Sequence, residues 1–164
     1  MVKISKTLAM RTLDAMKIAY TIHTYPEDIR DAVLVAQAIE APADRVFKTL
    51  VVLSDVPSSR PMLVMLPACA SLDERAFARE IGLKSVHMAP HTQAELLTGL
   101  KVGGISALAL LNRRFAMYID DSAHNNPTIY VSAGQRGIDV QLQTADLLRI
   151  TQCELLRASS TDKK

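Results

Sequence analysis

Residues Lys101 to Arg114 read KVGGISALALLNRR, and the rest of the chain is organised around this stretch. Two adjacent glycines, Gly103 and Gly104, interrupt an apolar run and precede a hydroxyl residue, Ser106. Glycine accepts positive φ angles and lets another group approach bare backbone. A loop of this kind can direct several N–H groups at one point and so hold an anion or a developing oxyanion. A tight turn that merely precedes a buried segment is the alternative interpretation.

A second glycine-containing stretch, Thr128 to Val140, reads TIYVSAGQRGIDV. Its polar and glycine positions lie between two alternating apolar segments, and they are Ser132, Gly134, Arg136, Gly137 and Asp139. The guanidinium of Arg136 suits a phosphate, whose oxygens it matches in a bidentate way. Asp139 faces away from its apolar neighbours Ile138 and Val140, so on sequence grounds alone it is compatible with a solvent-facing position on a strand.

A lysine stands at the start of the β-forming segment FKTLVV, from Phe47 to Val52. Lys48 either extends its ammonium to solvent where the strand begins, or has a partner or function there. The sequence predicts no metal or cofactor. His87 and His91 have the spacing of a zinc pair, but Pro90 argues against the uninterrupted helix that such a pair needs.

Hydrophobic periodicity and turn signals predict a mixed order of elements. We expect helices near residues 7–17, 28–40, 71–82, 92–99 and 144–150. We expect strands near 19–25, 46–54, 62–66, 85–88, 115–120, 128–132 and 138–143. Ser71 with Glu74, and Thr92 with Glu95, have the spacing of capping boxes. The predicted fold class is α+β, with a mixed β-sheet curled into a partial barrel and helices packed outside.

Composition bounds the class of protein. The chain has 164 residues, no Trp and 4% aromatic residues, which predicts one domain over 1–157 with an aliphatic core. The short polar segment 158–164 is expected to be a disordered tail. The net charge of +2 is too low for a general nucleic-acid coat, although a local basic site fits.

Targeting and cysteine patterns narrow the class further. No apolar run reaches the ~20 residues of a membrane span, and charges interrupt the N-terminal segment, so we expect neither membrane contact nor a signal peptide. Cys69 and Cys153 are too few for a disulfide framework. A cytoplasmic protein with free thiols fits these patterns, and the oligomeric state is left open.

The motifs resemble the YbaK/EbsC family of bacterial Cys-tRNA(Pro)/Cys-tRNA(Cys) deacylases, which includes the prolyl-tRNA synthetase-associated editing domain. The resemblance runs in order from IHTY at 22–25, through FKTLVV and the two glycine stretches, to DLLRI at 146–150. It implies the same α+β architecture and an aminoacyl-tRNA hydrolase without a cofactor. It also implies two partners, the aminoacylated 3′ end of tRNA and prolyl-tRNA synthetase.

The resemblance also implies a site. Its catalytic residues are Lys48, Gly103, Gly104, Ser132 and Asp139. Its substrate-binding residues are Tyr25, Ser106, Gly134, Arg136 and Gly137. In the family, the carboxylate at the position of Asp139 lies in the pocket, where it can recognise a substrate ammonium. No Ser or Cys is placed with a His in a nucleophile motif, and the family instead uses the thiol of the bound cysteine to attack its own ester carbonyl, with release of a thiolactone.

Three positions depart from the family pattern. Ala107 replaces the proline of GGISP, and Ala133 and Gln135 depart from SGGKRG. The expected activity is trans-editing of mischarged Cys-tRNA(Pro). An Ala- or Ser-tRNA deacylase of the same fold, and a non-catalytic tRNA- or nucleotide-binding regulatory module, are the alternatives.

Overall fold

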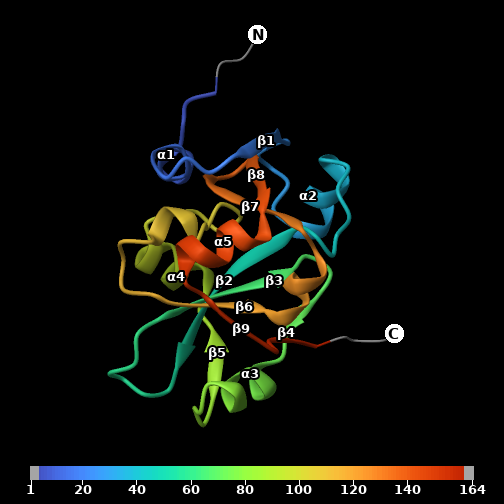
Figure 1. Cartoon of the computed structure of the whole chain (residues 1–164). Helices are drawn as coiled ribbons and strands as arrows, with labels where there is room; N and C mark the ends of the chain where they lie inside the picture. Colours follow the sequence, from blue (N-terminus) through green and yellow to red (C-terminus); the bar gives the residue numbers. More distant parts are fainter. Residues whose placement is uncertain (1–3, 161–164) are drawn as a thin grey trace.

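The computed structural model describes residues 4–160, which form a mixed α+β fold (Figure 1). The α-helices are α1 (Leu8–Ala15), α2 (Ala32–Ala38), α3 (Glu74–Glu80), α4 (His91–Thr98) and α5 (Thr144–Thr151). Two 3₁₀ helices are η1 (Leu108–Leu110) and η2 (Asp121–Asn125). None of the helices in this part of the chain has the length and apolar character of a membrane span. The predicted α+β class is confirmed.

The larger sheet has five strands in the order β5-β2-β3-β6-β9, with bounds β5 (Val86–Met88), β2 (Phe47–Ser54), β3 (Met62–Pro67), β6 (Ala116–Asp120) and β9 (Glu154–Leu156). Strand β2 is antiparallel to β3 and β5, whereas β6 is parallel to both β3 and β9. Every residue of the central strand β3 is buried, because elements cover both faces of the sheet.

The smaller sheet has three antiparallel strands in the order β1-β8-β7, with bounds β1 (Tyr20–Thr24), β8 (Ile138–Gln143) and β7 (Thr128–Gln135). A parallel bridge between Val46 and Tyr130 joins it to the start of β2. Figure 1 shows this sheet above the five-stranded one, with α1 and α2 on its two sides. Hydrogen bonding therefore divides these strands into two sheets that meet at this bridge. No closed barrel is found in residues 4–160, and the partial barrel stays a prediction.

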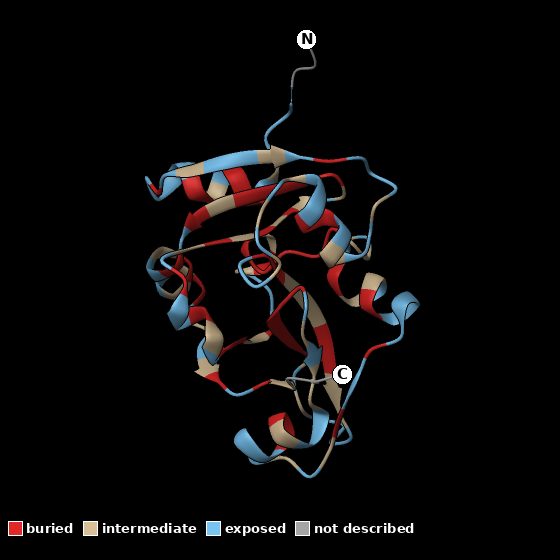
Figure 2. Ribbon diagram, turned by 90° about the vertical axis from the view of Figure 1, so that its right-hand side faces the viewer, coloured by how far each residue is buried: buried red, intermediate tan, exposed pale blue. Residues whose placement is uncertain are grey.

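The main core is aliphatic and lies between the two sheets. It includes Leu13 of α1, Val51 of β2 and Val140 of β8, each at most 4% exposed. A second cluster lies on the other face of the five-stranded sheet, where Val64 of β3 packs near Phe77 of α3. Figure 2 shows the buried residues on the inner strands and on the inward sides of the helices. The two sides of β2 therefore belong to two different clusters.

The C-terminal segment is more ordered than its composition suggests. Ser159–Ser160 form β10, which pairs with β4 (Ser71–Leu72), and Ala158 is fully buried. Backbone N–H groups of Ala158 and Ser159 donate to Asp120 Oδ1 at 2.9 and 2.8 Å. The buried Asp120 carboxylate requires such donors, which holds this segment in place. A disordered tail is therefore the wrong prediction for 158–160, and residues 161–164 lie outside the described residues.

Neither predicted capping box forms. Ser71 lies in β4, and Asp73 caps α3 by accepting a hydrogen bond from the Ala76 N–H at 3.0 Å. Helix α4 has Pro90 at its N-cap and no side-chain cap, while Glu95 accepts a hydrogen bond from the Val102 N–H at 2.9 Å. The carboxylate that we assigned to a helix start is thus bonded to the loop that follows the helix.

Candidate active site

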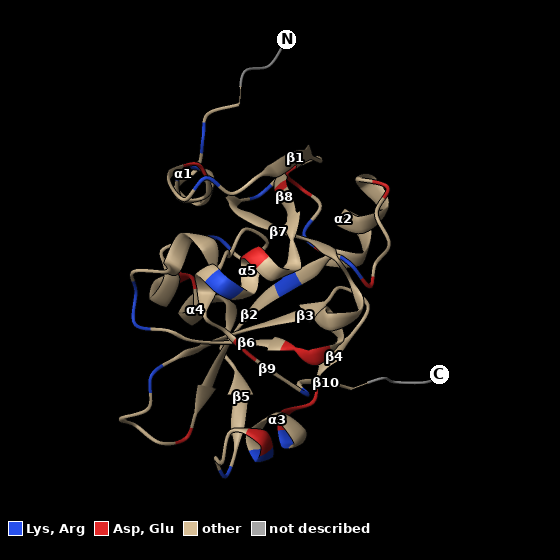
Figure 3. Ribbon diagram, in the orientation of Figure 1, with Lys and Arg blue, Asp and Glu red and all other residues tan. Residues whose placement is uncertain are grey.

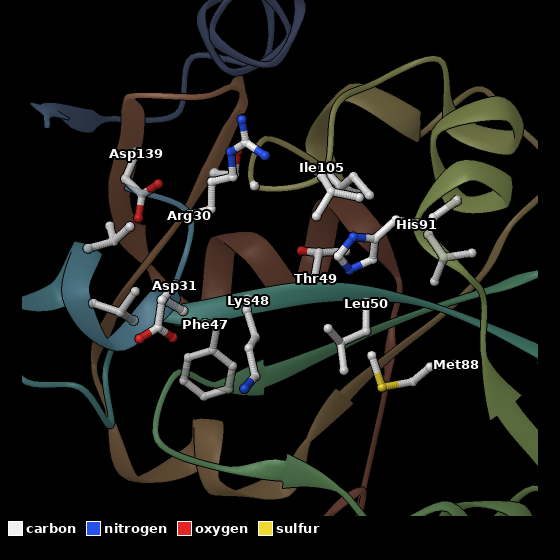
Figure 4. Close-up of a pocket in the computed structure, with 18 of the residues that line it drawn as sticks. Arg30, Asp31, Phe47, Lys48, Thr49, Leu50, Met88, His91, Ile105 and Asp139 are labelled. Atoms are coloured by element: carbon white, nitrogen blue, oxygen red, sulfur yellow. The ribbon is translucent and has the colours of Figure 1, made fainter. Parts of the chain in front are cut away.

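A cavity of about 240 Å³ opens where β2, the segment before α2, the loop after α4 and the β7–β8 hairpin meet (Figure 4). Its wall includes five of the ten site residues predicted from the sequence, which are Tyr25, Lys48, Gly103, Ser132 and Asp139. These residues come from parts of the chain more than 100 positions apart, so the tertiary fold brings the separate motifs to one site.

The other five predicted residues do not line the cavity, and they are Gly104, Ser106, Gly134, Arg136 and Gly137. Gly104, Arg136 and Gly137 instead contact the backbone of segments that form the wall. A Cβ on Gly104 would lie 2.8 Å from the backbone nitrogen of Arg136, so only glycine lets the two loops touch. Gly137 has φ of 89° and packs against the backbone oxygen of Tyr25. Ser106 is buried, and no hydrogen-bond partner of its hydroxyl is found in the described chain.

Asp139 is the buried carboxylate of the cavity. It is 4% exposed and lies opposite Ser132 in the β7–β8 pairing. The Tyr25 hydroxyl donates to Asp139 Oδ1 at 3.4 Å, and the Tyr25 N–H donates to the Gly137 carbonyl at 2.9 Å. Burial raises the pKa of Asp139 to about 7, and the Tyr25 hydrogen bond only partly opposes this effect. A carboxylate so short of partners fits a cationic ligand group.

Lys48 is half-buried at the start of β2. Its ammonium donates to the Ala68 carbonyl at 3.3 Å. Burial lowers the pKa of Lys48 below its ordinary value, while the nearby Asp31 and Cys69 act in the opposite direction. Figure 4 shows the Lys48 side chain on one side of β2, and Thr49 and Asp139 on the other side. Lys48 and Asp139 therefore line different parts of the wall. The hydrogen-bond partner of the Lys48 ammonium within the protein is the backbone carbonyl of Ala68.

The glycine loop is held by a pair of charged side chains. Glu95 Oε2 accepts from the Val102 N–H at 2.9 Å, and Arg136 Nε donates to the Val102 carbonyl at 2.8 Å. The Gly104 N–H closes a turn to the Lys101 carbonyl at 2.8 Å. Gly103, at the cavity wall, has φ of 94°, a conformation that favours glycine. Both backbone groups of Val102, the residue before Gly103, are thus hydrogen-bonded to charged side chains, and this fixes the backbone at the cavity wall.

Ser132 precedes a bulge in β7. The register with β8 shifts between Ser132 and Gln135, and Gly134 takes φ of 94° within the shift. The Gly134 N–H donates to Ser132 Oγ at 3.1 Å. Bulges of this kind re-aim side chains next to active sites. Here the bulge leaves Ser132 on the cavity wall beside Asp139.

Several wall residues were not predicted, and the clearest are Arg30, Asp31, Thr49 and His91. Thr49 directly follows Lys48 in the same motif, and no partner of its buried hydroxyl is found in the described residues. Arg30 and Asp31 lie in an exposed polar segment that carries no motif. His91 begins α4, whereas His87 lies on β5, 3.7 Å from Asp55, so the two histidines belong to different elements.

The family model for the aminoacyl-tRNA editing domain matches residues 26–150. The Enterococcus faecalis (strain ATCC 700802 / V583) protein named "Putative Cys-tRNA(Pro)/Cys-tRNA(Cys) deacylase EbsC" is 31% identical over 148 residues, which cover 89% of this chain and 88% of that protein. The chain therefore belongs to the aminoacyl-tRNA editing domain family. This confirms the predicted family and the predicted class of enzyme, an aminoacyl-tRNA hydrolase.

Solved structures show the same fold. A crystal structure of a hypothetical protein matches with a TM-score of 0.83 and 19% identity, over 93% of this chain and 99% of that one. A "putative trans-editing enzyme for prolyl tRNA synthetase" matches with a TM-score of 0.77 and 20% identity, over 96% of this chain and 99% of that one. At these identities the matches support the fold, while the site rests on the residues above.

Proposed function

We propose that the chain is a trans-editing deacylase that hydrolyses mischarged Cys-tRNA(Pro) with the help of the substrate's own thiol. The observation that carries this proposal is the small cavity in which the buried Asp139 carboxylate lies beside the Gly103 loop. Such a cavity fits an aminoacyl group, which brings an ammonium and an ester carbonyl that are two bonds apart. The ammonium pairs with Asp139, and the carbonyl faces the loop.

The wall offers no thiol of the protein as a nucleophile. Cys69 is exposed and Cys153 is half-buried, and neither lines the cavity. In the proposed reaction the substrate's sulfur attacks the carbonyl carbon: a C–S bond forms, the bond to the ribose oxygen breaks, and that oxygen takes up the thiol proton. Water then opens the resulting thiolactone to give free cysteine. Holding sulfur and carbonyl in one cavity supplies the proximity that this path needs.

The Gly103 loop stabilises the reaction centre in this proposal. Negative charge develops on the carbonyl oxygen as sulfur attacks, and a fixed backbone N–H donor commonly contributes about 3 kcal/mol to such a centre. The hydrogen bonds of Glu95 and Arg136 to Val102 keep this backbone from moving. Lys48 adds positive charge to another part of the wall.

Prolyl-tRNA synthetase is the proposed partner, and it would supply most of the tRNA recognition in the cytoplasm. The formal net charge is only +2, and Figure 3 shows basic and acidic residues scattered over the molecule, with both kinds on α3 and α5. A protein with this distribution lacks the broad basic face that holds long stretches of nucleic acid. Recognition of the acceptor end alone is consistent with it.

The departures from the family pattern leave the cavity wall intact. Ala107 is buried at the start of η1 and lies outside the wall. Ala133 is fully buried in the core, and Gln135 is exposed on the hairpin. None of these three positions lines the cavity, which supports cysteine rather than alanine or serine as the proposed substrate amino acid.

Single-turnover deacylation of Cys-, Ala- and Ser-tRNA(Pro), with and without prolyl-tRNA synthetase, tests the proposal. We expect Cys-tRNA(Pro) to react at least about 100-fold faster than Ala-tRNA(Pro), because alanine has no thiol to attack the ester. A pocket cannot easily reject a smaller side chain by size, so such a difference would point to the thiol rather than to fit. Equal rates on Cys- and Ala-tRNA(Pro) would refute thiol assistance and favour the Ala-tRNA alternative. Binding of tRNA without hydrolysis of any substrate would favour the regulatory module.

A further inference from the structure

Two arginines flank the glycine of the cavity wall. A Cβ on Gly103 would lie 3.5 Å from Arg30 Cγ and 3.6 Å from Arg136 Cγ. The two side chains therefore pack on the same backbone position from different elements, one from the segment before α2 and the other from the β7–β8 hairpin. Sequence motifs drew attention to Arg136 alone, as a phosphate contact.

Arg136 is already engaged within the protein. Its Nε donates to the Val102 carbonyl at 2.8 Å, and its Nη2 lies 3.9 Å from Glu95 Oε2. The side chain is 23% exposed, and it does not line the cavity. A phosphate at Arg136 would compete with the Glu95 carboxylate for the same guanidinium. Its position instead fixes the peptide that precedes Gly103.

Arg30 is in the opposite situation. It is exposed and lines the cavity, and within residues 4–160 its guanidinium makes no hydrogen bond or ion pair with another residue. Figure 4 shows the Arg30 side chain between Asp139 and Ile105, with its guanidinium directed away from Lys48. A planar, permanently charged fork at the rim of a cavity is suited to bidentate contact with phosphate oxygens.

We propose that Arg30 binds a phosphate of the tRNA acceptor end, and that Arg136 is a positioning residue for the Gly103 loop. This assignment rests on the proposed function. The ester to be cleaved is on the terminal ribose, and the 5′-phosphate of that same nucleoside is the anion nearest to it in the covalent structure. When the aminoacyl group occupies the cavity, a cation at the rim is placed to meet this phosphate. The hydrogen bonds of Arg136 act on the rate through the backbone that faces the ester.

A pair of small substrates separates the two roles. We would compare 3′-O-cysteinyl-adenosine with its 5′-phosphate, which differ only in the group that Arg30 would bind. For each enzyme variant, the ratio of kcat/KM for the phosphorylated over the unphosphorylated compound measures the phosphate contact. The variants are Arg30→Ala, Arg30→Lys, Arg136→Ala and Arg136→Lys, with Arg75→Ala on the exposed face of α3 as the matched control.

The ratio should fall about tenfold in Arg30→Ala and recover partly in Arg30→Lys, which keeps the charge but loses the fork. In Arg136→Ala, kcat should fall on both compounds while the ratio stays near that of the wild type, and Arg136→Lys replaces this variant if it does not fold. Arg75→Ala should match the wild type.

Three outcomes count against the assignment in different ways. An unchanged ratio in Arg30→Ala, with both compounds hydrolysed, refutes the phosphate contact alone. A fall of about tenfold in this ratio in the Arg136 variant would show that Arg136, and not Arg30, binds the phosphate. Failure of the wild type to hydrolyse either cysteinyl compound and Cys-tRNA(Pro) refutes the proposed function and this assignment with it.

Discussion

Replacing Asp139 by asparagine should make the protein's stability less dependent on pH. Burial raises the pKa of Asp139 from the usual 3.8 to about 7 in the folded protein. The folded state therefore binds a proton that the unfolded state has released between these two values, so wild-type stability falls as pH rises through this window. The rise corresponds to about 4 kcal/mol, at about 1.4 kcal/mol for each pKa unit. An asparagine has no proton to lose and avoids this cost.

Urea unfolding of the wild type and Asp139→Asn at several values between about pH 4 and pH 8 measures the effect. The free energy of unfolding of the variant minus that of the wild type should increase with pH, by an amount that approaches about 4 kcal/mol. Other titrating groups cancel in this difference. Asp28→Asn, at an exposed position outside the cavity wall, is the matched control. A difference for Asp139→Asn that stays constant with pH would show that this carboxyl is solvated.

Two further variants test the cavity wall and the nucleophile. Gly104→Ala should lower the free energy of unfolding by about 1–3 kcal/mol, because the new Cβ would lie 2.8 Å from the Arg136 backbone nitrogen. An unaltered urea midpoint would show that the two loops are not in contact in solution. The double variant Cys69→Ala, Cys153→Ala should deacylate Cys-tRNA(Pro) at close to the wild-type rate, since neither thiol reaches the cavity. Loss of activity there would identify a protein nucleophile.

Motif residues that the backbone itself constrains were predictable from the sequence. Gly103 was recognisable because its positive φ and its close packing require glycine, whatever the rest of the fold does. Asp139 was assigned to the site through the family resemblance, because strand alternation alone places it opposite Ile138 and Val140 and is compatible with a solvent-facing position. The sequence did not reveal that this face is buried, since that depends on Tyr25 crossing over from the end of β1.

Residues without such local constraints were not predictable. Arg30 lies in an exposed polar segment, and its position beside Gly103 arises only when the segment before α2 folds over the glycine loop. Glu95 has the spacing of a capping residue, but the Val102 N–H competes successfully for its carboxylate. The order of residues 158–160 likewise depends on a distant group, the buried carboxylate of Asp120. Each of these contacts joins segments that no local pattern links.

Two carboxylates near the cavity have opposite environments, and the contrast separates structure from ligand binding. Glu95 accepts a hydrogen bond from the Val102 N–H and lies near Arg136, and the pKa of Glu95 is lowered chiefly by that backbone donor. Among residues 4–160, the Asp139 side chain has only the long hydrogen bond from Tyr25, and burial raises its pKa. The pKa values of the two acids are thus shifted in opposite directions. Glu95, which has a backbone N–H donor, holds the loop, whereas Asp139, which has none, can still bind a ligand cation. A ligand ammonium at Asp139 would supply the missing partner and favour the ionised carboxylate, so binding of the aminoacyl group and loss of the Asp139 proton are coupled.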